Sequence, residues 1–424
     1  PPHPQPLSPR GEGVERAMFR RTPRKPADAP AERFRLVGVD LTATRLRAVS
    51  VGTGHLRPLL LDGPNEDLPL FVTLDRREAD LGHAGLAVCR LTPHAVCSNF
   101  LPLLGTPHEW RGDRRSHTPE SALAECLGRL NAPVTAETDA AGLTVPPYLS
   151  LQQVRAVLEM AAAVRLPLRG SAVTPLAIVA HRVGSVGAGP KGAEPAVLVI
   201  DADESALTAA LVTVGTEDVR VIDKTTVPKA SLRAWKDRLI DGLADKCVRA
   251  CRRDPRDSAV AEQDLYLQLG SLLETAKSGH SFTVAVRSDR WYQDLTVHPD
   301  DLEGICTGVN RAAIDGLKEF LGNAPLDGPP RAVWLTAAAG RLPGLAAKIV
   351  KHSPAETKVS LLPANAAAEA AAALVPRWLT GKLPRTHLDV VLPHAAPMAI
   401  GVGPAASIGR ANGHDPRALP RKAD

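Results

Sequence analysis

The sequence predicts an α/β protein with a duplicated core, and two observations support this prediction. A strand that ends in an aspartate, a short polar turn and a second strand occur twice, at residues 34–52 and at residues 196–214. Segments with helical periodicity follow each copy, so strands and helices alternate along the chain. One arrangement repeated about 160 residues apart indicates two related halves.

The first copy, FRLVGVDLTATRLRAVSVG, begins at Phe34 and contains an apolar strand that ends at Asp40, a polar turn and a second strand with β-branched alternation. This pattern predicts a β-hairpin with an acidic residue at its turn. In the second copy, AVLVIDADESALTAALVTV, Asp201 ends the strand and the segment DESA forms the turn. Residues 218–227 predict a third strand in this half.

Helices are predicted from periodicity and capping residues. Residues 149–168 show helical periodicity after a serine cap near their start, and the pattern recurs at residues 230–254 and 263–279. Residues 331–352 predict a strand, a small-residue turn and a helix, and residues 364–379 predict an alanine-rich helix. The turn would present backbone amides at a helix start, either as an anion or nucleotide site or as tight packing.

Composition excludes several function classes. Aromatic residues make up only 3% of the 424 residues, which disfavours a stacking platform for single-stranded nucleic acid. The net charge of +5 is small, and we interpret the basic residues near both ends as solvated tails. No apolar run reaches the roughly 18 residues of a membrane span, and no hydrophobic signal core is visible. We therefore expect a cytoplasmic protein without nucleic-acid or membrane partners.

The cysteines and the amino-terminal segment contribute no site. The six cysteines form no Cys-x-x-Cys pair, so reduced thiols are expected. Cys247 and Cys251 would share a helix face, but without a nearby histidine they do not define a metal site. Residues 1–33 are rich in proline and arginine and cannot bury a core, so this leader should be disordered.

The order of four segments resembles the nucleotide-binding domain of the heat-shock protein 70 chaperones, a family with the actin-like ATPase fold. GVDLTAT (38–44) resembles the first phosphate loop, Gly-x-Asp-Leu-Gly-Thr-Thr. Residues 143–181 resemble the stretch with Val-Pro-Ala-Tyr, a long helix and Asn-Glu-Pro-Thr-Ala-Ala. Residues 197–212 resemble the second phosphate loop, Asp-Leu-Gly-Gly-Gly-Thr-x-Asp, and LTAAAGRLPGL (335–345) resembles the adenosine motif, Gly-Gly-Ser-x-Arg-Ile-Pro.

The resemblance implies two lobes with duplicated ribonuclease-H-like cores around a nucleotide cleft. It divides the chain into the leader (1–33), lobe I (34–195), lobe II with the adenosine motif (196–384), and a linker-like segment with a disordered tail (385–424). Only about 20 residues follow the linker-like segment, so we expect no substrate-binding domain.

The phosphate loops depart from the family pattern. Thr42 replaces a glycine in the first loop, and Asp203, Glu204 and Ser205 replace three glycines in the second. Glycines let backbone amides approach phosphates, whereas two added carboxylates would face and repel them, unless they bind a metal or form an exposed acidic turn. The residues that the resemblance assigns to the phosphates are Thr42, Thr44, Asp203 and Ser205.

The residues of phosphate transfer also differ from the family. Leu101 stands at about the position of the family's lysine, and Thr174 stands at that of its glutamate near the metal-bound water. Positioning and charge neutralisation supply most of the catalysis in phosphoryl transfer, so hydrolysis should be impaired. Asp40 and Asp201 match the family's metal-shell aspartates and are the candidates to hold magnesium.

The adenosine end retains the family's residues. Glu274, Lys277 and Ser281 stand at the family's offsets, and Gly340 and Arg341 belong to the adenosine motif. Glu274 and Lys277 would share a helix face and bind ribose hydroxyls, or form an ordinary surface ion pair, and Arg341 can stack on adenine. The implied ligand is ATP or ADP with magnesium, weakly bound.

Three functions stay open. The first is a heat-shock-70-like binding or regulatory module with impaired hydrolysis, whose partners would be an adenine nucleotide and other proteins. The second is a working ATPase or small-molecule kinase of the same fold, in which Asp203 and Glu204 bind metal in a rearranged site. The third is an actin-like or pilus-assembly-like scaffold that binds no nucleotide.

Overall fold

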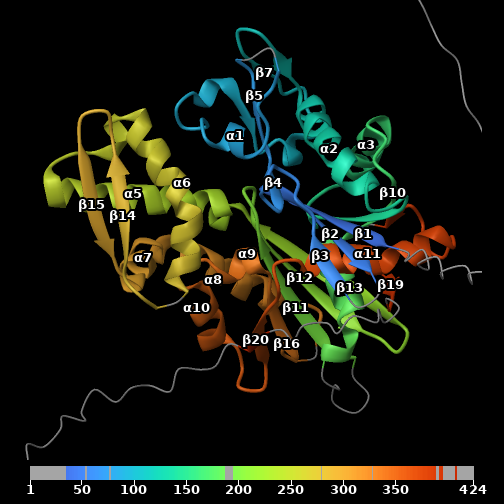
Figure 1. The fold of residues 1–424 in the computed structure, drawn as a ribbon. Coiled ribbons are helices and arrows are strands. Elements are labelled where there is room, and N and C mark those ends of the chain that lie inside the picture. Colours follow the sequence, from blue (N-terminus) through green and yellow to red (C-terminus); the bar gives the residue numbers. More distant parts are fainter. Residues whose placement is uncertain are drawn as a thin grey trace, which may run out of the picture. The chain divides into compact units, whose positions relative to one another are not determined.

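The computed structural model describes residues 35–52, 55–75, 78–186, 194–277, 279–326, 328–387, 391–394 and 406–407. The predicted leader (1–33), Phe34 and most of the predicted tail lie outside these residues. Within them the chain combines two large sheets with helices, which confirms the predicted α/β class (Figure 1). No helix in the described ranges is long and apolar enough to cross a membrane.

The first large sheet consists of β1 (Leu36–Leu41), β2 (Arg45–Gly52), β3 (His55–Pro58), β4 (Asp67–Pro69), β9 (Ala141–Val145), β10 (Leu168–Val173) and β18 (Thr386–His387). Its order is β18-β10-β9-β1-β2-β3, and β4 pairs with β2. Strands β1, β2 and β3 form an antiparallel meander, and β9 and β10 join it in parallel with β1.

The second large sheet consists of β11 (Ala196–Ala202), β12 (Leu207–Val214), β13 (Asp218–Val227), β16 (Ala332–Leu335), β17 (Lys358–Leu361), β19 (Val391–Pro393) and β20 (Ala406–Ser407). Its order is β19-β13-β12-β11-β16-β17-β20. Strands β11, β12 and β13 form an antiparallel meander, and β16 and β17 join in parallel with β11. The two sheets therefore share one pairing pattern.

The segment predicted as a linker contributes to both sheets. Strand β18 pairs with β10 of the first sheet, and β19 pairs with β13 of the second. The described part of residues 385–394 therefore supplies an edge strand to each sheet, where its extended backbone pairs with the otherwise unpaired N–H and C=O groups of β10 and β13.

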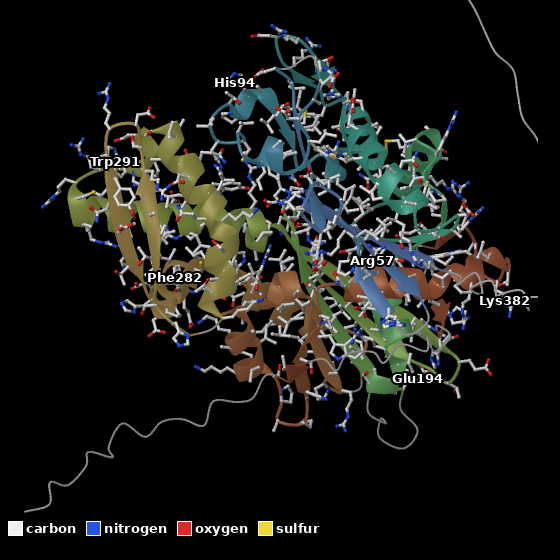
Figure 2. The ribbon with its side chains drawn as sticks, in the orientation of Figure 1. Arg57, His94, Glu194, Phe282, Trp291 and Lys382 are labelled. Carbon is white, nitrogen blue, oxygen red and sulfur yellow. The ribbon has the colours of Figure 1, made fainter. Side chains whose placement is uncertain are left out.

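Helices and short hairpins complete the described chain. The helices are α1 (His83–Leu86), α2 (Pro119–Thr135), α3 (Leu151–Ala163), α4 (Thr174–His181), α5 (Leu232–Cys251), α6 (Ala259–Ala276), α7 (Pro299–Ile305), α8 (Thr307–Asn323), α9 (Ala337–Gly340), α10 (Leu345–His352) and α11 (Ala366–Leu379). The two-stranded sheets pair β5 (Phe71–Thr73) with β6 (Val96–Ser98), β7 (Trp110–Arg111) with β8 (Ser116–His117), and β14 (Phe282–Arg287) with β15 (Tyr292–Val297). Phe282 and Trp291 lie at opposite ends of the last hairpin (Figure 2).

Helices α4 and α11 pack between the two large sheets. The alanine-rich α11 follows the second sheet in sequence but packs on β1, β2 and β9 of the first, whereas α4 packs on β12 and β13 of the second. Strand glycines permit this close approach. A Cβ on Gly38 would lie 1.8 Å from the carbonyl oxygen of Ala368, and a Cβ on Gly142 would lie 2.4 Å from that of Ala371.

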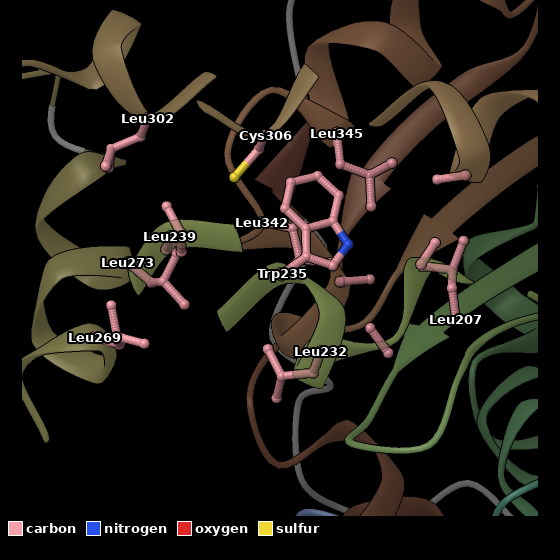
Figure 3. Packing of buried hydrophobic residues seen from close by; sticks show 14 of the residues in the cluster. Leu207, Leu232, Trp235, Leu239, Leu269, Leu273, Leu302, Cys306, Leu342 and Leu345 are labelled. Carbon is pink, nitrogen blue, oxygen red and sulfur yellow. The ribbon is translucent and has the colours of Figure 1, made fainter. Parts of the chain in front are cut away.

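Buried apolar side chains form a core on each sheet and a third core between the sheets. The first sheet packs with α2 and α3, and the second packs with α5, α6 and α8. In this second core the fully buried Trp235 lies among Leu342, Leu345 and Cys306 (Figure 3). The third core joins α4 and α11, so one continuous apolar contact connects the two sheets.

Candidate functional site

A cavity of about 160 Å³ lies where the turns of the two hairpins meet. We call it the cleft cavity. It is lined by the end of β1, the start of β2, the end of β11, the turn before α9 and a residue of α6. Ligand pockets commonly measure about 300–1,000 Å³, so this cavity is too small for a whole ATP in the conformation seen here.

The structure brings six of the predicted site residues to the cleft cavity and leaves five outside its lining. Those that line it are Asp40, Thr42, Thr44, Asp201, Glu274 and Arg341. Those that do not are Asp203, Ser205, Lys277, Ser281 and Gly340.

Asp40 and Asp201 are the penultimate residues of the equivalent strands β1 and β11, and each accepts a hydrogen bond from a threonine. Thr144 Oγ1 donates to Asp40 Oδ1 at 3.1 Å, and Thr336 Oγ1 donates to Asp201 Oδ1. Burial raises the pKa of Asp40, although Arg45 opposes this effect. Burial, together with the charge of Asp40, raises the pKa of Asp201 to about 7, although Thr336 opposes this rise.

Asp203 joins the two hairpin turns directly. Its Oδ2 accepts hydrogen bonds from the Ala43 amide at 3.0 Å and from the Tyr148 hydroxyl at 2.6 Å. Its Oδ1 accepts from the amides of Ser205 at 2.9 Å and Ala206 at 3.1 Å. The prediction that this carboxylate faces the phosphate position as an open repulsive charge is therefore wrong, because it is buried and bound to the opposite turn.

Glu204 points away from the cleft cavity as well. It forms an ion pair with Lys236 Nζ of α5, which also donates to the Tyr266 hydroxyl at 3.3 Å. Burial lowers the pKa of Lys236, but Glu204 and Tyr266 raise it more strongly, so the lysine stays charged. The acidic turn is thus neither exposed nor free to hold a metal, because its second carboxylate neutralises the partly buried Lys236.

The first turn is closed by its own side chains. Thr42 Oγ1 accepts from the amides of Thr44 and Arg45 at 3.3 and 3.2 Å. Thr44 Oγ1 accepts from the Glu204 amide at 3.1 Å, which adds a second bond between the two turns. The amides of Thr44, Arg45 and Glu204, which could otherwise donate to a phosphate, therefore donate to threonine hydroxyls of the first turn. The two threonines still line the cleft cavity.

The adenosine-end residues are brought together in part. Glu274 Oε2 accepts from Lys277 Nζ at 2.9 Å, and Glu274 Oε1 lies 3.8 Å from Arg341 Nη1. Ser281 instead bonds His298 Nδ1, and a Cβ on Gly340 would lie 2.1 Å from Leu361 Cδ2. Gly340 therefore serves helix packing against β17.

Leu101 and Thr174, which stand at the predicted positions for phosphate transfer, have structural roles. Leu101 is fully buried in the core of the first sheet. Thr174 begins α4, and its hydroxyl donates to the Val145 carbonyl at 2.9 Å. Neither side chain could position a phosphate and a water, because one is apolar and the other is bonded to the backbone.

Sequence reasoning missed three parts of the site. Arg45 and Arg47 of β2 line the cleft cavity, and their alternation on one strand face was the available signal. Lys236 had no sequence signal, because a lysine on an amphipathic helix normally faces solvent. Arg90 was also missed. Its guanidinium donates to Asp237 of α5 at 2.6 Å and to Glu262 of α6 at 3.3 Å.

The residues present do not provide for a magnesium–nucleotide pair in this conformation. Magnesium in such sites is held by one or two carboxylates and by the phosphates themselves. Asp40 and Asp201 supply two carboxylates, but the Ala43 amide in the turn that resembles the first phosphate loop already donates to Asp203. Within the described ranges, no group of three or more His, Cys, Asp or Glu residues could hold a metal ion.

Scans of the chain against models of protein families and against curated proteins find no match. The geometry of the cleft cavity is therefore the basis for the function proposed below.

Proposed function

We propose that the chain is a heat-shock-70-like nucleotide-binding-domain protein that has lost phosphate transfer. It acts as a binding or regulatory module, and its own side chains hold the cleft closed. The pairing pattern shared by the two sheets supports the actin-like part of this proposal, since the family fold has duplicated cores. The exchange of α4 and α11 between the sheets supports it too.

The observation that carries the proposal is the contact between Asp203 and Ala43. A carboxylate that accepts hydrogen bonds from several backbone amides is chemically similar to a phosphate group bound by successive backbone amides. Asp203 therefore plays the part of a bound phosphate between the two turns. ATP or ADP would have to displace it, so nucleotide binding should be micromolar or weaker, with no detectable turnover.

A working ATPase or kinase is less consistent with the site. Glu204, which would have to bind metal there, neutralises Lys236, and Leu101 is buried in the core. The scaffold without nucleotide is favoured by the same Asp203 contact, since a cleft closed by its own residues needs no ligand.

Calorimetric titration with ATP and ADP, with and without magnesium, separates these functions. The proposed module should show weak heats that depend little on magnesium. Tight binding that requires magnesium would support the working ATPase, and no binding to the wild type or to an Asp203→Gly variant would support the scaffold.

A further inference from the structure

Three arginines line the cleft cavity with donors that lack acceptors. Arg45 and Arg47 come from β2, and Arg341 follows α9. The Nη1 of Arg45, the Nε of Arg47 and the Nε of Arg341 are buried and make no hydrogen bond to any residue that the structure describes. Buried polar groups normally have a partner, so three such donors on one cavity indicate a missing acceptor.

The carboxylates of the cavity do not fill this need. Arg45 lies 3.9 Å from Asp40 and 4.0 Å from Asp67, and Arg341 lies 3.8 Å from Glu274. These separations exceed hydrogen-bond length. Three of the lining carboxylates instead have closer partners, which are Thr144 for Asp40, Thr336 for Asp201 and Lys277 for Glu274.

Arg45 also repels the other two arginines. Burial lowers the pKa of Arg341 and of Arg47, and the charge of Arg45 lowers both pKa values further, whereas nearby carboxylates, Asp67 among them, oppose the lowering without cancelling it. Guanidinium groups keep their proton in proteins, so this repulsion persists in the closed cleft. An anion among the three groups would offset it.

We propose that the cleft cavity binds a small phosphate-class oxyanion through Arg45, Arg47 and Arg341. Guanidinium groups suit this ligand, because their forked donors match phosphate oxygens. The volume of about 160 Å³ is roughly ten times what one water needs, so a tetrahedral oxyanion has room in the cavity. The inference deepens the proposed function and rests on it, since it names what the closed cleft binds.

The test is calorimetric titration of the full chain with inorganic phosphate, AMP and adenosine. Inorganic phosphate should bind with one molecule per chain. Arg47→Gln and Arg341→Gln should each weaken its binding about tenfold or more, because each removes a charged donor. Arg111→Gln is the matched control, since this arginine is 79% exposed and pairs with Glu109 outside the cavity.

The ligands distinguish the sources of the oxyanion. Preference for inorganic phosphate indicates the free ion, and preference for AMP with no binding of adenosine indicates a phosphate ester; both support an oxyanion site. Adenosine that binds as well as AMP would overturn it, as would phosphate affinity that survives both arginine substitutions.

A thermal-shift measurement on the unmodified chain needs no variant. Phosphate should raise the unfolding temperature above that in chloride of equal ionic strength, and the absence of any shift would overturn the inference. The proposed function fails separately, since it is contradicted by ATP hydrolysis, which this experiment does not measure.

Discussion

Asp203 is satisfied without any ligand. An ionised carboxylate offers about four acceptor sites, and Asp203 receives four hydrogen bonds from Ala43, Tyr148, Ser205 and Ala206. Burial raises the pKa of this carboxyl, and these four donors oppose that rise. The sequence predicts a hairpin turn at Asp203, but the bond to Ala43 joins residues 160 positions apart. Local patterns could not predict it.

Replacing Asp203 with glycine should open the phosphate side of the cleft. The amide of Ala43 would become free for a phosphate oxygen, so ADP should bind about tenfold more tightly or better. Titration calorimetry measures this change. Unchanged ADP affinity in a folded Asp203→Gly variant would show that the contact does not block the site.

Glu204→Gly is the matched control for this substitution. It would leave the partly buried Lys236 without its carboxylate and should cost about 1–3 kcal/mol of stability, with no gain in ADP affinity. Replacing the whole turn with glycines would mix these two effects.

His181 at the end of α4 should make stability depend on pH. Burial, together with the charge of Arg182, lowers its pKa from 6.5 to about 4. The unfolded chain then binds the proton more readily, so the folded state loses stability as the pH falls below the unfolded pKa. His181→Gln should remove up to about 2 kcal/mol of the loss between neutral pH and about pH 5. Urea unfolding at both pH values measures the difference, and equal losses in both proteins would refute the assignment.

At the scale of elements, the sequence predicts the parts whose periodicity is local. The hairpins β1-β2 and β11-β12 and the helices α3, α5, α6, α10 and α11 are found where the patterns predict them. Helices α2 and α8 and the hairpin β14-β15 were not predicted. In α2 an internal proline, Pro133, and an internal Gly128 weaken the helical pattern, and the contacts of Leu123, Leu127 and Leu130 with the core stabilise the helix instead.

Close contact between α11 and β1 should make Gly38 intolerant of any side chain. Gly38→Ala should destabilise the fold by about 3 kcal/mol or more, because the new Cβ would meet backbone atoms that cannot turn aside. Gly52→Ala on the neighbouring strand is the matched control, since open space surrounds that position. Denaturant unfolding compares the two, and equal stabilities would contradict the packing described.

The ion pair between Arg182 and Glu369 links α4 to α11 at 3.1 Å, with the Arg182 side chain only 1% exposed. Glu369→Gln should cost about 3–5 kcal/mol, since it removes a carboxylate that pairs with a buried charge. Methionine at both positions should recover most of that loss. A double-mutant cycle by chemical denaturation measures the coupling, and additive effects of the single variants would argue against it.

At the scale of the whole molecule, the two halves meet at several places among the described residues, and three of these contacts bear on the cleft. Helices α4 and α11 join the sheets, the hairpin turns bond each other through Asp203 and Thr44, and Arg90 bonds residues of α5 and α6. The cleft cavity lies between the first two of these contacts and has residual volume beside the arginines. The cleft is therefore closed by the protein's own contacts on several sides.

The candidate site could be predicted from the sequence in part, at the strand ends and at Glu274 and Arg341. Asp40 and Asp201 reach the cleft cavity because equivalent strands end there in both halves. The partners of Asp203 and Glu204 could not be predicted, because Tyr148 and Lys236 reach them from other elements. Ser281 shares its spacing with the family pattern but bonds His298, so spacing alone did not fix its position.

The most direct test of the central claim, a closed cleft without phosphate transfer, is magnesium-dependent phosphate release from ATP by the unmodified chain. The contacts of Asp203, the burial of Leu101 and the engagement of Glu204 predict no release above that of an Asp201→Ala variant. Robust release by the unmodified chain that is lost in Asp201→Ala would contradict the account and would identify the cleft cavity as a rearranged active site.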